Sequence, residues 1–193
     1  MKCRWFIILF VVMLLCAGNL SAGTVNPRVS MQTSLGPIII ELDRQAAPKT
    51  VENFINYAET GFYDETIFHR VIKGFMIQGG GLTKDMQRKK TGQPIENEAD
   101  NGLKNTRGSI AMARTMNPHS ATAQFFINTA DNKNLDFTSK TTQGWGYCVF
   151  GRVVSGMEIV DKIESTPTTL RAGRRDVPVE TVTIESVAVI AAQ

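Results

Sequence analysis

Residues 66–80, with the sequence TIFHRVIKGFMIQGG, decide the fold that we predict for this chain. Two short apolar runs, 67–72 and 75–78, are separated by Lys73-Gly74, and consecutive glycines follow the second run. Short apolar runs bounded by glycine are typical of β-strands. Further runs of this kind, with polar loops between them, lie at 109–113, 125–128 and 149–154. The middle of the chain is therefore predicted to consist mainly of short strands.

The segment before this stretch predicts a hairpin followed by a helix. Residues 28–33 and 37–42 are β-like, and Ser34-Leu35-Gly36 supplies a short turn between them. A helix opens near Pro48, which suits the first helical position, and Gly61 is a suitable stop. Its apolar residues follow helical spacing: Val51, Phe54, Ile55 and Ala58.

The end of the chain adds a short helix and a last strand. The helix is predicted at residues 157–163, and residues 179–190 alternate and are rich in β-branched side chains, as in a strand. About eight strands with one or two helices predict a β-barrel or sandwich whose ends are closed by helices. No internal repeat or linker interrupts residues 24–193, which we interpret as one domain.

The composition is that of an ordinary globular protein. The chain has 193 residues, of which 42% are hydrophobic and 20% charged, and its formal net charge is +3. These values exclude collagen-like, low-complexity and disordered classes of protein. The basic residues form only two short runs, Arg88-Lys89-Lys90 and Arg174-Arg175, which we interpret as solvated loops. Because nucleic-acid binding needs a clustered basic face, no nucleic-acid partner is expected.

Residues 1–23 have the features of a secretory signal peptide. Lys2 and Arg4 precede thirteen apolar residues, 5–17, and small or polar residues follow. The apolar run is shorter than the about 20 residues of a membrane span, and an uncleaved membrane anchor and a lipoprotein at Cys16 are the alternatives. Cleavage leaves 19 basic and 18 acidic residues, a net charge of +1. We therefore expect a secreted protein without stable membrane association.

The other chemistry-bearing residues predict neither a metal site nor a cofactor. Cys148 is the one cysteine left after cleavage, so it cannot form an intrachain disulfide, and its apolar neighbours indicate a buried hydrophobe. His69 and His119 have no second ligand at metal-binding spacing. Gly79-Gly80-Gly81 is not followed by the Lys-Ser/Thr of a phosphate-binding loop, so we interpret it as a close backbone approach.

Three segments together resemble the cyclophilins, a family of peptidyl-prolyl cis/trans isomerases. They are residues 68–80 (FHRVIKGFMIQGG), residues 109–113 with 123–128 (SIAMA and AQFFIN), and residues 147–151 (YCVFG). With its signal peptide, the chain is most similar to the bacterial periplasmic branch. The resemblance implies a mainly β fold, namely a closed eight-stranded antiparallel β-barrel capped by two α-helices. It also implies peptidyl-prolyl cis-trans isomerase (rotamase) activity, EC 5.2.1.8, and a substrate groove on the outside of a packed barrel.

The resemblance also implies roles for individual residues. Arg70 matches the family's catalytic arginine, and nine residues match its substrate-binding groove: Phe75, Met76, Gln78, Ala113, Arg114, Gln124, Phe126, Leu135 and Tyr147. The family often has Asn in place of Arg114 and His in place of Tyr147, and its eukaryotic members have Trp in place of Asn134. The last difference predicts weak binding of the inhibitor cyclosporin, unless Trp145 folds back from the loop 131–146 to supply an indole.

These residue types suit the isomerisation of X–Pro bonds. The barrier of about 18–20 kcal/mol comes from amide resonance, and because no bond breaks, neither a metal nor a cofactor is required. Adjacent strand residues point to opposite faces, so we expect one of Phe125 and Phe126 in the core and the other in the groove. The expected partners are proline-containing segments of unfolded or folding proteins, and a monomer is expected. The alternatives are a chaperone-like binding module without turnover and a scaffold protein.

Overall fold

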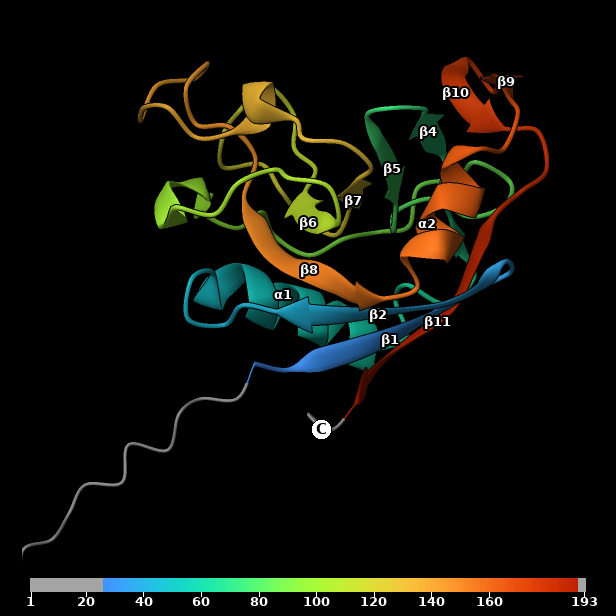
Figure 1. Ribbon diagram of the computed structural model, residues 1–193, viewed down its shortest axis with the longest axis horizontal. Coiled ribbons are helices and arrows are strands. Elements are labelled where there is room, and N and C mark those ends of the chain that lie inside the picture. The colour runs from blue at the N-terminus through green and yellow to red at the C-terminus, as the bar shows by residue number, and fades with distance from the viewer. Residues whose placement is uncertain (1–25, 191–193) are drawn as a thin grey trace, which may run out of the picture.

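The computed structural model describes residues 26–190, and the predicted signal peptide, residues 1–23, lies outside them. The described chain forms one nine-stranded antiparallel sheet, a separate two-stranded sheet and two α-helices (Figure 1). The predicted class, mainly β with two helices, is therefore confirmed. Among these residues, no helix has both the length and the hydropathy that crossing a membrane requires.

The large sheet has the strand order β3-β11-β1-β2-β8-β6-β7-β5-β4. Its strands are β1 (Arg28–Thr33), β2 (Gly36–Leu42), β3 (Thr66–Ile67), β4 (Arg70–Ile72), β5 (Met76–Gly79), β6 (Ser109–Met112), β7 (Phe125–Asn128), β8 (Val149–Ser155) and β11 (Thr183–Ile190). The small sheet pairs β9 (Thr168–Arg171) with β10 (Arg174–Pro178). The helices are α1 (Pro48–Glu59) and α2 (Met157–Glu164), with single 3₁₀ turns η1 (Ala99–Asn101) and η2 (Lys133–Leu135).

The predicted boundaries agree with most of these elements. The hairpin β1–β2 is confirmed, although β2 begins one residue earlier than predicted, and α1 opens at Pro48. The predicted last strand, in contrast, begins only at Thr183. The deciding stretch, 66–80, holds three short strands. Gly74, with φ +70°, reverses the chain between the last two of them, β4 and β5.

The large sheet curls strongly, because the two strands at the ends of its strand order follow each other in the chain. Only Phe68 and His69 separate β3, at one end of the strand order, from β4 at the other. In Figure 1, β1, β2, β8 and β11 occupy the lower part of the view, and β4 to β7 lie above them. Helix α1 packs against β11, whereas α2 packs against β2, β4 and β5. The curled sheet and its helices thus surround one main core.

Side chains that alternate along the strands divide between two apolar clusters. Ile77, Phe125 and Ile127 belong to the main core and are fully buried. Their neighbours Met76 and Phe126 belong to a second, smaller cluster. Because successive strand residues point to opposite faces, this second cluster lies on the outer face of the curled sheet. Phe125 is therefore the core residue of its pair, and Phe126 is the one left for an external groove.

The core also tests our interpretations of Gly80, as a close backbone approach, and of Cys148, as a buried hydrophobe. Gly80 has φ +77°, and a Cβ there would lie 2.5 Å from the ring of Phe125, so this glycine permits the close backbone approach that we expected. Cys148 is buried, and burial raises the pKa of its thiol to about 12. The thiol is therefore protonated at neutral pH and behaves as a small hydrophobe.

Candidate active site

One row of residues crosses the outer face of the sheet from β4 to β6. Arg70 on β4 is opposite Gln78 on β5, which is in turn opposite Phe126 on β7. Phe126 is opposite Ala111 on β6. Directly opposed residues of antiparallel strands point to the same face. The register therefore places a guanidinium, an amide and an aromatic ring side by side, although they come from separate parts of the chain.

A pocket of about 120 Å³ lies along this row. It is lined by Arg70, Phe75, Met76, Gln78, Ala113, Arg114, Phe126, Leu135 and Tyr147. The structure therefore brings every predicted site residue except Gln124 to one cavity. Gln124 lies beside it, because its side-chain oxygen accepts a hydrogen bond of 3.1 Å from Nε2 of Gln78.

The walls of the pocket are apolar and come from the second cluster. Met76 and Phe126 are almost completely buried, whereas Phe75, Leu135 and Tyr147 are partly buried and pack against them. The rings of Phe126 and Tyr147 meet edge to face, with centroids 5.6 Å apart. Such walls can hold a small apolar ring, and polar side chains border them, namely Arg70, Gln78 and Arg114.

Arg70 is held loosely at the edge of the pocket. Its side chain is 43% exposed, and its Nε lies 3.9 Å from Oδ2 of Asp176, which is 40% exposed. Its Nη1 lies 3.5 Å from Oε1 of Gln78, at the outer limit of a hydrogen bond. A guanidinium has five N–H donors. Arg70 therefore has donors to spare for a group bound in the pocket.

Arg114, by contrast, is fixed. Its Nε donates to the carbonyl oxygen of Gly146 at 2.8 Å, and its Nη1 donates to that of Thr115 at 2.9 Å. Its guanidinium carbon lies 4.6 Å from the centroid of the Tyr147 ring, close enough for a cation–π contact. Arg114 thus forms a rigid cationic rim above Tyr147. At both of these positions the sequence departs from the family's usual residues.

A buried asparagine cluster, which the sequence did not reveal, supports the pocket. Asn132 donates from Nδ2 to the backbone oxygen of Phe75 at 2.8 Å and to Oδ1 of Asn128 at 2.7 Å. Asn105 donates to the backbone oxygen of Leu135 at 3.1 Å and accepts at its Oδ1 from Asn128 at 3.2 Å. The three asparagines therefore tie the turn η2 to β5 and β7, and so hold two pocket walls in place. In the sequence these residues stand apart, at 105, 128 and 132, and share no motif that would have grouped them.

His69 adjoins Arg70 in the chain but is buried. Its side chain is 4% exposed, and within residues 26–190 its Nδ1 has no hydrogen-bond partner. Burial, reinforced by the charges of Arg174 and Arg70, lowers the pKa of the imidazole to about 4. His69 is therefore uncharged at neutral pH and supplies no proton to a bound group there.

The two basic runs are largely solvated, as interpreted, since Arg88, Lys90 and Arg175 are exposed, but Arg174 and Arg175 belong to strand β10 and not to a loop. Arg88, Arg174 and Arg175 line a second cavity, of about 420 Å³, which shares Arg70 and Arg114 with the first. The run at 88–90 is tied back to the fold because Arg88 pairs with the buried Leu82 in an isolated bridge. Arg174 and Arg175 reach the cavity because β10 packs against β4. Contacts between distant segments, which a local charge pattern does not encode, produce this arrangement.

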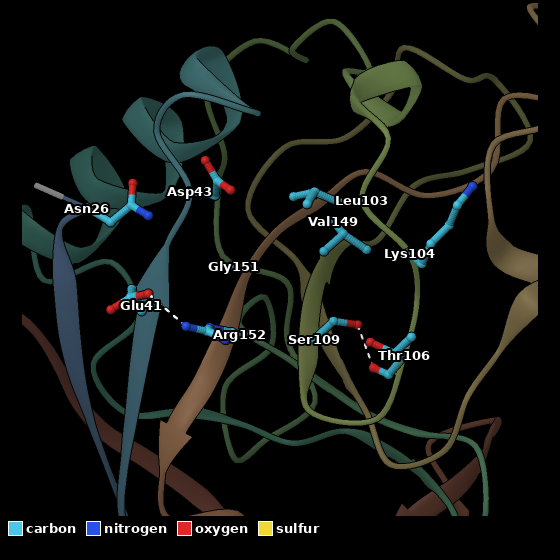
Figure 2. Close-up of a pocket in the computed structure, with 10 residues that line it drawn as sticks. All are labelled: Asn26, Glu41, Asp43, Leu103, Lys104, Thr106, Ser109, Val149, Gly151 and Arg152. Carbon is cyan, nitrogen blue, oxygen red and sulfur yellow. Dashed lines mark hydrogen bonds and ion pairs between the residues drawn. The ribbon is translucent and has the colours of Figure 1, made fainter. Parts of the chain in front are cut away.

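A third cavity, of about 330 Å³, lies away from the predicted site residues (Figure 2). It contains acidic and basic groups together, including Glu41, Asp43, Lys104 and Arg152. Figure 2 shows Arg152 turned toward Glu41, with which it forms an ion pair of 3.3 Å. In the part of the chain that the structure describes, no three His, Cys, Asp or Glu side chains gather as metal ligands would.

The structure also shows where the indole of Trp145 lies relative to Asn134. Asn134 lines a shallow depression next to the apolar pocket, together with Met116 and Leu135. Trp145 is only 9% exposed and lies between Phe137 and His119, with ring centroids 5.5 Å and 4.9 Å away. Trp145 therefore does not fold back beside Asn134.

Comparisons with known proteins agree with this geometry. A family model described as cyclophilin type peptidyl-prolyl cis-trans isomerase/CLD matches residues 28–189. Over 162 residues the chain is 59% identical to peptidyl-prolyl cis-trans isomerase cyp18 of Streptomyces antibioticus, covering 84% of this chain and 98% of that protein. Over 161 residues it is 58% identical to peptidyl-prolyl cis-trans isomerase B of Escherichia coli, covering 83% and 98%.

A solved structure is also similar. It is the crystal structure of a cyclophilin type peptidyl-prolyl cis-trans isomerase of Cryptosporidium parvum in the presence of the dipeptide Ala-Pro. The TM-score is 0.71 at 27% sequence identity, and the match covers 86% of this chain and 99% of that one. The family model and the bacterial relatives span nearly the whole described chain. This chain therefore belongs to the cyclophilin-type peptidyl-prolyl cis-trans isomerases, and it is a peptidyl-prolyl cis-trans isomerase, EC 5.2.1.8.

Proposed function

We propose that Arg70 drives the isomerisation by stabilising the twisted prolyl amide while the apolar pocket holds the proline ring. The observation that carries this proposal is the 120 Å³ pocket, whose apolar walls meet a guanidinium with spare donors on one side. The Cryptosporidium relative, solved in the presence of Ala-Pro, supports a proline-containing ligand for a cavity of this kind.

The chemistry follows from the electronic structure of the amide. In the planar form, resonance places the nitrogen lone pair in the C–N bond, and this causes the barrier of about 18–20 kcal/mol. In the twisted form the prolyl nitrogen becomes pyramidal and recovers its lone pair. A donor from Arg70 can then hydrogen-bond that nitrogen, which accepts only weakly in the planar form. The interaction is stronger in the transition state than in either ground state, and this is the condition for catalysis.

The other site residues have complementary roles in this proposal. Phe75, Met76, Phe126 and Leu135 grip the ring, whose apolar surface matches theirs. Gln78 and Gln124, bonded to each other, orient Arg70 and offer polar groups to the substrate backbone. Ala113, Arg114 and Tyr147 complete the rim of the pocket. Because no bond breaks and no proton moves, neither a metal nor a cofactor takes part.

We also infer that the large sheet is the closed eight-stranded barrel of the family. Counting β3 and β4 as two halves of one bent strand gives eight strands. The backbone of the bend bonds to both neighbours, because Phe68 N–H donates to the carbonyl of Val182 and His69 N–H donates to that of Gln78, each at 3.0 Å. Hydrogen bonding therefore continues from β11 to β5 around the curled sheet.

We propose that the enzyme assists the folding of exported proteins in the periplasm. The support is the sequence of residues 1–23, with its basic start, short apolar run and small-residue end. The substrates are proline-containing segments of unfolded or folding chains, and the domain, residues 24–193, acts as a monomer. Slow X–Pro isomerisation is a rate-limiting folding step for many proteins, so a rotamase in that compartment has a use.

The test is Arg70→Ala, assayed on an Ala-Pro peptide. We expect kcat/KM to fall by at least about a hundredfold, or about 3 kcal/mol, mostly through kcat, because the lost contact exists mainly in the transition state. Arg70→Lys is expected to fall similarly, because lysine keeps the charge but not the planar donors. Arg107→Ala is a matched control, since Arg107 is 45% exposed and pairs with Asp161 away from the pocket.

The same assay separates the isomerase from a binding module. Parental turnover by Arg70→Ala, with an unchanged circular dichroism spectrum, would contradict the mechanism. A parent protein that binds the peptide but leaves its exchange rate unchanged would favour a chaperone-like holding function.

A further inference from the structure

The cavity of about 420 Å³ beside the proline pocket has a one-sided charge. Five arginines line it, namely Arg70, Arg88, Arg114, Arg174 and Arg175, and its lining includes no Asp or Glu. The cavity in Figure 2 provides a contrast, because there acidic and basic side chains face each other. Clefts lined by charges of one sign concentrate the electric field and attract ligands of the opposite sign.

Most of this charge is not neutralised within the protein. Arg70 has Asp176 at 3.9 Å, an exposed and therefore weak pair. Within the described part of the chain, the other four arginines form no ion pair. His69 also lines the cavity, and the charges of Arg174 and Arg70 contribute to its lowered pKa. The positive potential of the cavity therefore acts on the imidazole of His69.

The β9–β10 hairpin supplies two of these arginines. Its register shifts between Arg174 and Val177, and Asp176 within the shift has φ +63°. A bulge of this kind leaves the residues inside it, here Arg175 and Asp176, unpaired and re-aims their side chains. Asp176 thereby reaches Arg70, while Arg174 and Arg175 line the cavity. The hairpin therefore adds cations next to the site and leaves most of them unpaired.

The distance between the two cavities can be estimated from β7. Phe126 lines the proline pocket, and Gln124, two residues earlier, lines the cationic cavity. Two residues of extended chain span about 7 Å. An extended peptide that runs along β7, with its proline beside Phe126, would place the side chain two residues away at the level of Gln124.

We propose that this cavity is a specificity subsite that binds a carboxylate side chain two residues from the substrate proline. The inference rests on the proposed proline pocket and adds to it the class of substrate, namely acidic segments. Arginine suits this role because its planar donors match a carboxylate. The direction of the peptide decides whether the acidic residue precedes or follows the proline.

The experiment compares peptides that differ only at that position. Glu, Gln or Lys is placed two residues before the proline in one series and two residues after it in a second, and the rates are measured by NMR exchange. At low salt we expect kcat/KM for Glu to exceed that for Gln by about fivefold or more in one series, with Lys lowest, mainly through KM. In 0.5 M NaCl the preference is expected to fall below about twofold, because salt screens partly exposed charges.

A pair of double variants assigns the preference to the hairpin. Arg174→Gln/Arg175→Gln is expected to reduce the Glu-to-Gln ratio below about twofold, because the subsite loses two of its cations. Lys104→Gln/Arg152→Gln removes the same net charge from the cavity of Figure 2 and is expected to keep the parental ratio.

Three results would overturn the inference. They are equal kcat/KM for Glu and Gln in both series, a preference that survives the hairpin variant, and an equal loss in the control variant. The proposed mechanism is judged separately by turnover of the Gln peptides. Their turnover without a preference for Glu defeats the subsite alone, whereas a parent inactive on every peptide defeats both.

Discussion

Burial of His69 is expected to make the stability of this enzyme fall steeply in mild acid. The imidazole is 4% exposed, and burial, with the charges of Arg174 and Arg70, lowers its pKa to about 4. In the unfolded chain the pKa is about 6.5. Between these two values the unfolded state binds more protons than the folded state. The free energy of unfolding therefore decreases as the pH falls from 6.5 toward 4.

The size of the decrease follows from the difference in pKa. About 2.5 units at 1.36 kcal/mol per unit give a loss of about 3 kcal/mol between pH 7 and pH 4. Domains are typically stable by only about 5–15 kcal/mol, so a loss of this size is easily measured. The carboxyl groups of Glu41, Glu96 and Asp100 have lowered pKa values because each pairs with a cation, and protonating them in acid also destabilises the fold. A comparison with a variant is therefore needed to isolate His69.

The variant is His69→Gln, which does not titrate. Urea denaturation of the parent and the variant at pH 7, 5.5 and 4 gives the free energy of unfolding of each. The variant is expected to be the less stable at pH 7, because the packing around the ring is lost, and its disadvantage is expected to shrink by about 3 kcal/mol at pH 4. Parallel pH dependences of the two proteins would refute the reasoning, since they would show that His69 binds its proton equally in both states.

Three further outcomes are expected. The turnover rate is expected to be nearly constant between pH 6 and 8 and insensitive to EDTA, because the proposed mechanism moves no proton and uses no metal, and His69 is already neutral; a bell-shaped profile would reveal a proton transfer. Asn132→Ala is expected to lower the free energy of unfolding by about 1–3 kcal/mol and to raise KM, because Oδ1 of Asn128 loses its donor and the backbone oxygen of Phe75 keeps only the N–H of Thr129; urea denaturation showing no change would contradict this. Asn134→Trp is expected to strengthen cyclosporin binding about ten- to seventyfold, from 60–100 Å² of added apolar contact at about 25 cal/mol/Å²; equal inhibition of parent and variant would contradict it.

Much of the fold was predictable because its signals are local. The hairpin β1–β2 and the helix α1 are encoded by turn residues and apolar spacing within a few positions. That one of Phe125 and Phe126 points outward also follows from the sequence, since adjacent strand residues cannot share a face, whereas the choice of Phe126 came from the family resemblance. The closeness of Arg70 to Phe126, in contrast, depends on pairing β4 with β5 and β5 with β7, for which the resemblance to a known family was needed.

Contacts between distant segments account for what the sequence alone did not predict. Helix α1 is one example, because the residue before it, Ala47, has no side chain that can cap it. The carboxylate of Glu98 instead accepts hydrogen bonds from the backbone N–H groups of Lys49 and Thr50, at 3.1 Å and 2.8 Å. The cap comes from a long loop almost fifty residues away. No window of sequence around the helix contains that information.

The arginines of the β9–β10 hairpin show how the same limit affects function. A run such as Arg174-Arg175, beside Gly173 and Asp176, has the composition of a solvated turn. Two structural facts change its meaning, namely the register shift before Val177 and the packing of β10 against β4. A one-residue change in register reverses the face to which a strand residue points. The positive charges of Arg174 and Arg175 therefore belong to the surface around Arg70. Substitutions in this hairpin are expected to change which peptides the enzyme prefers.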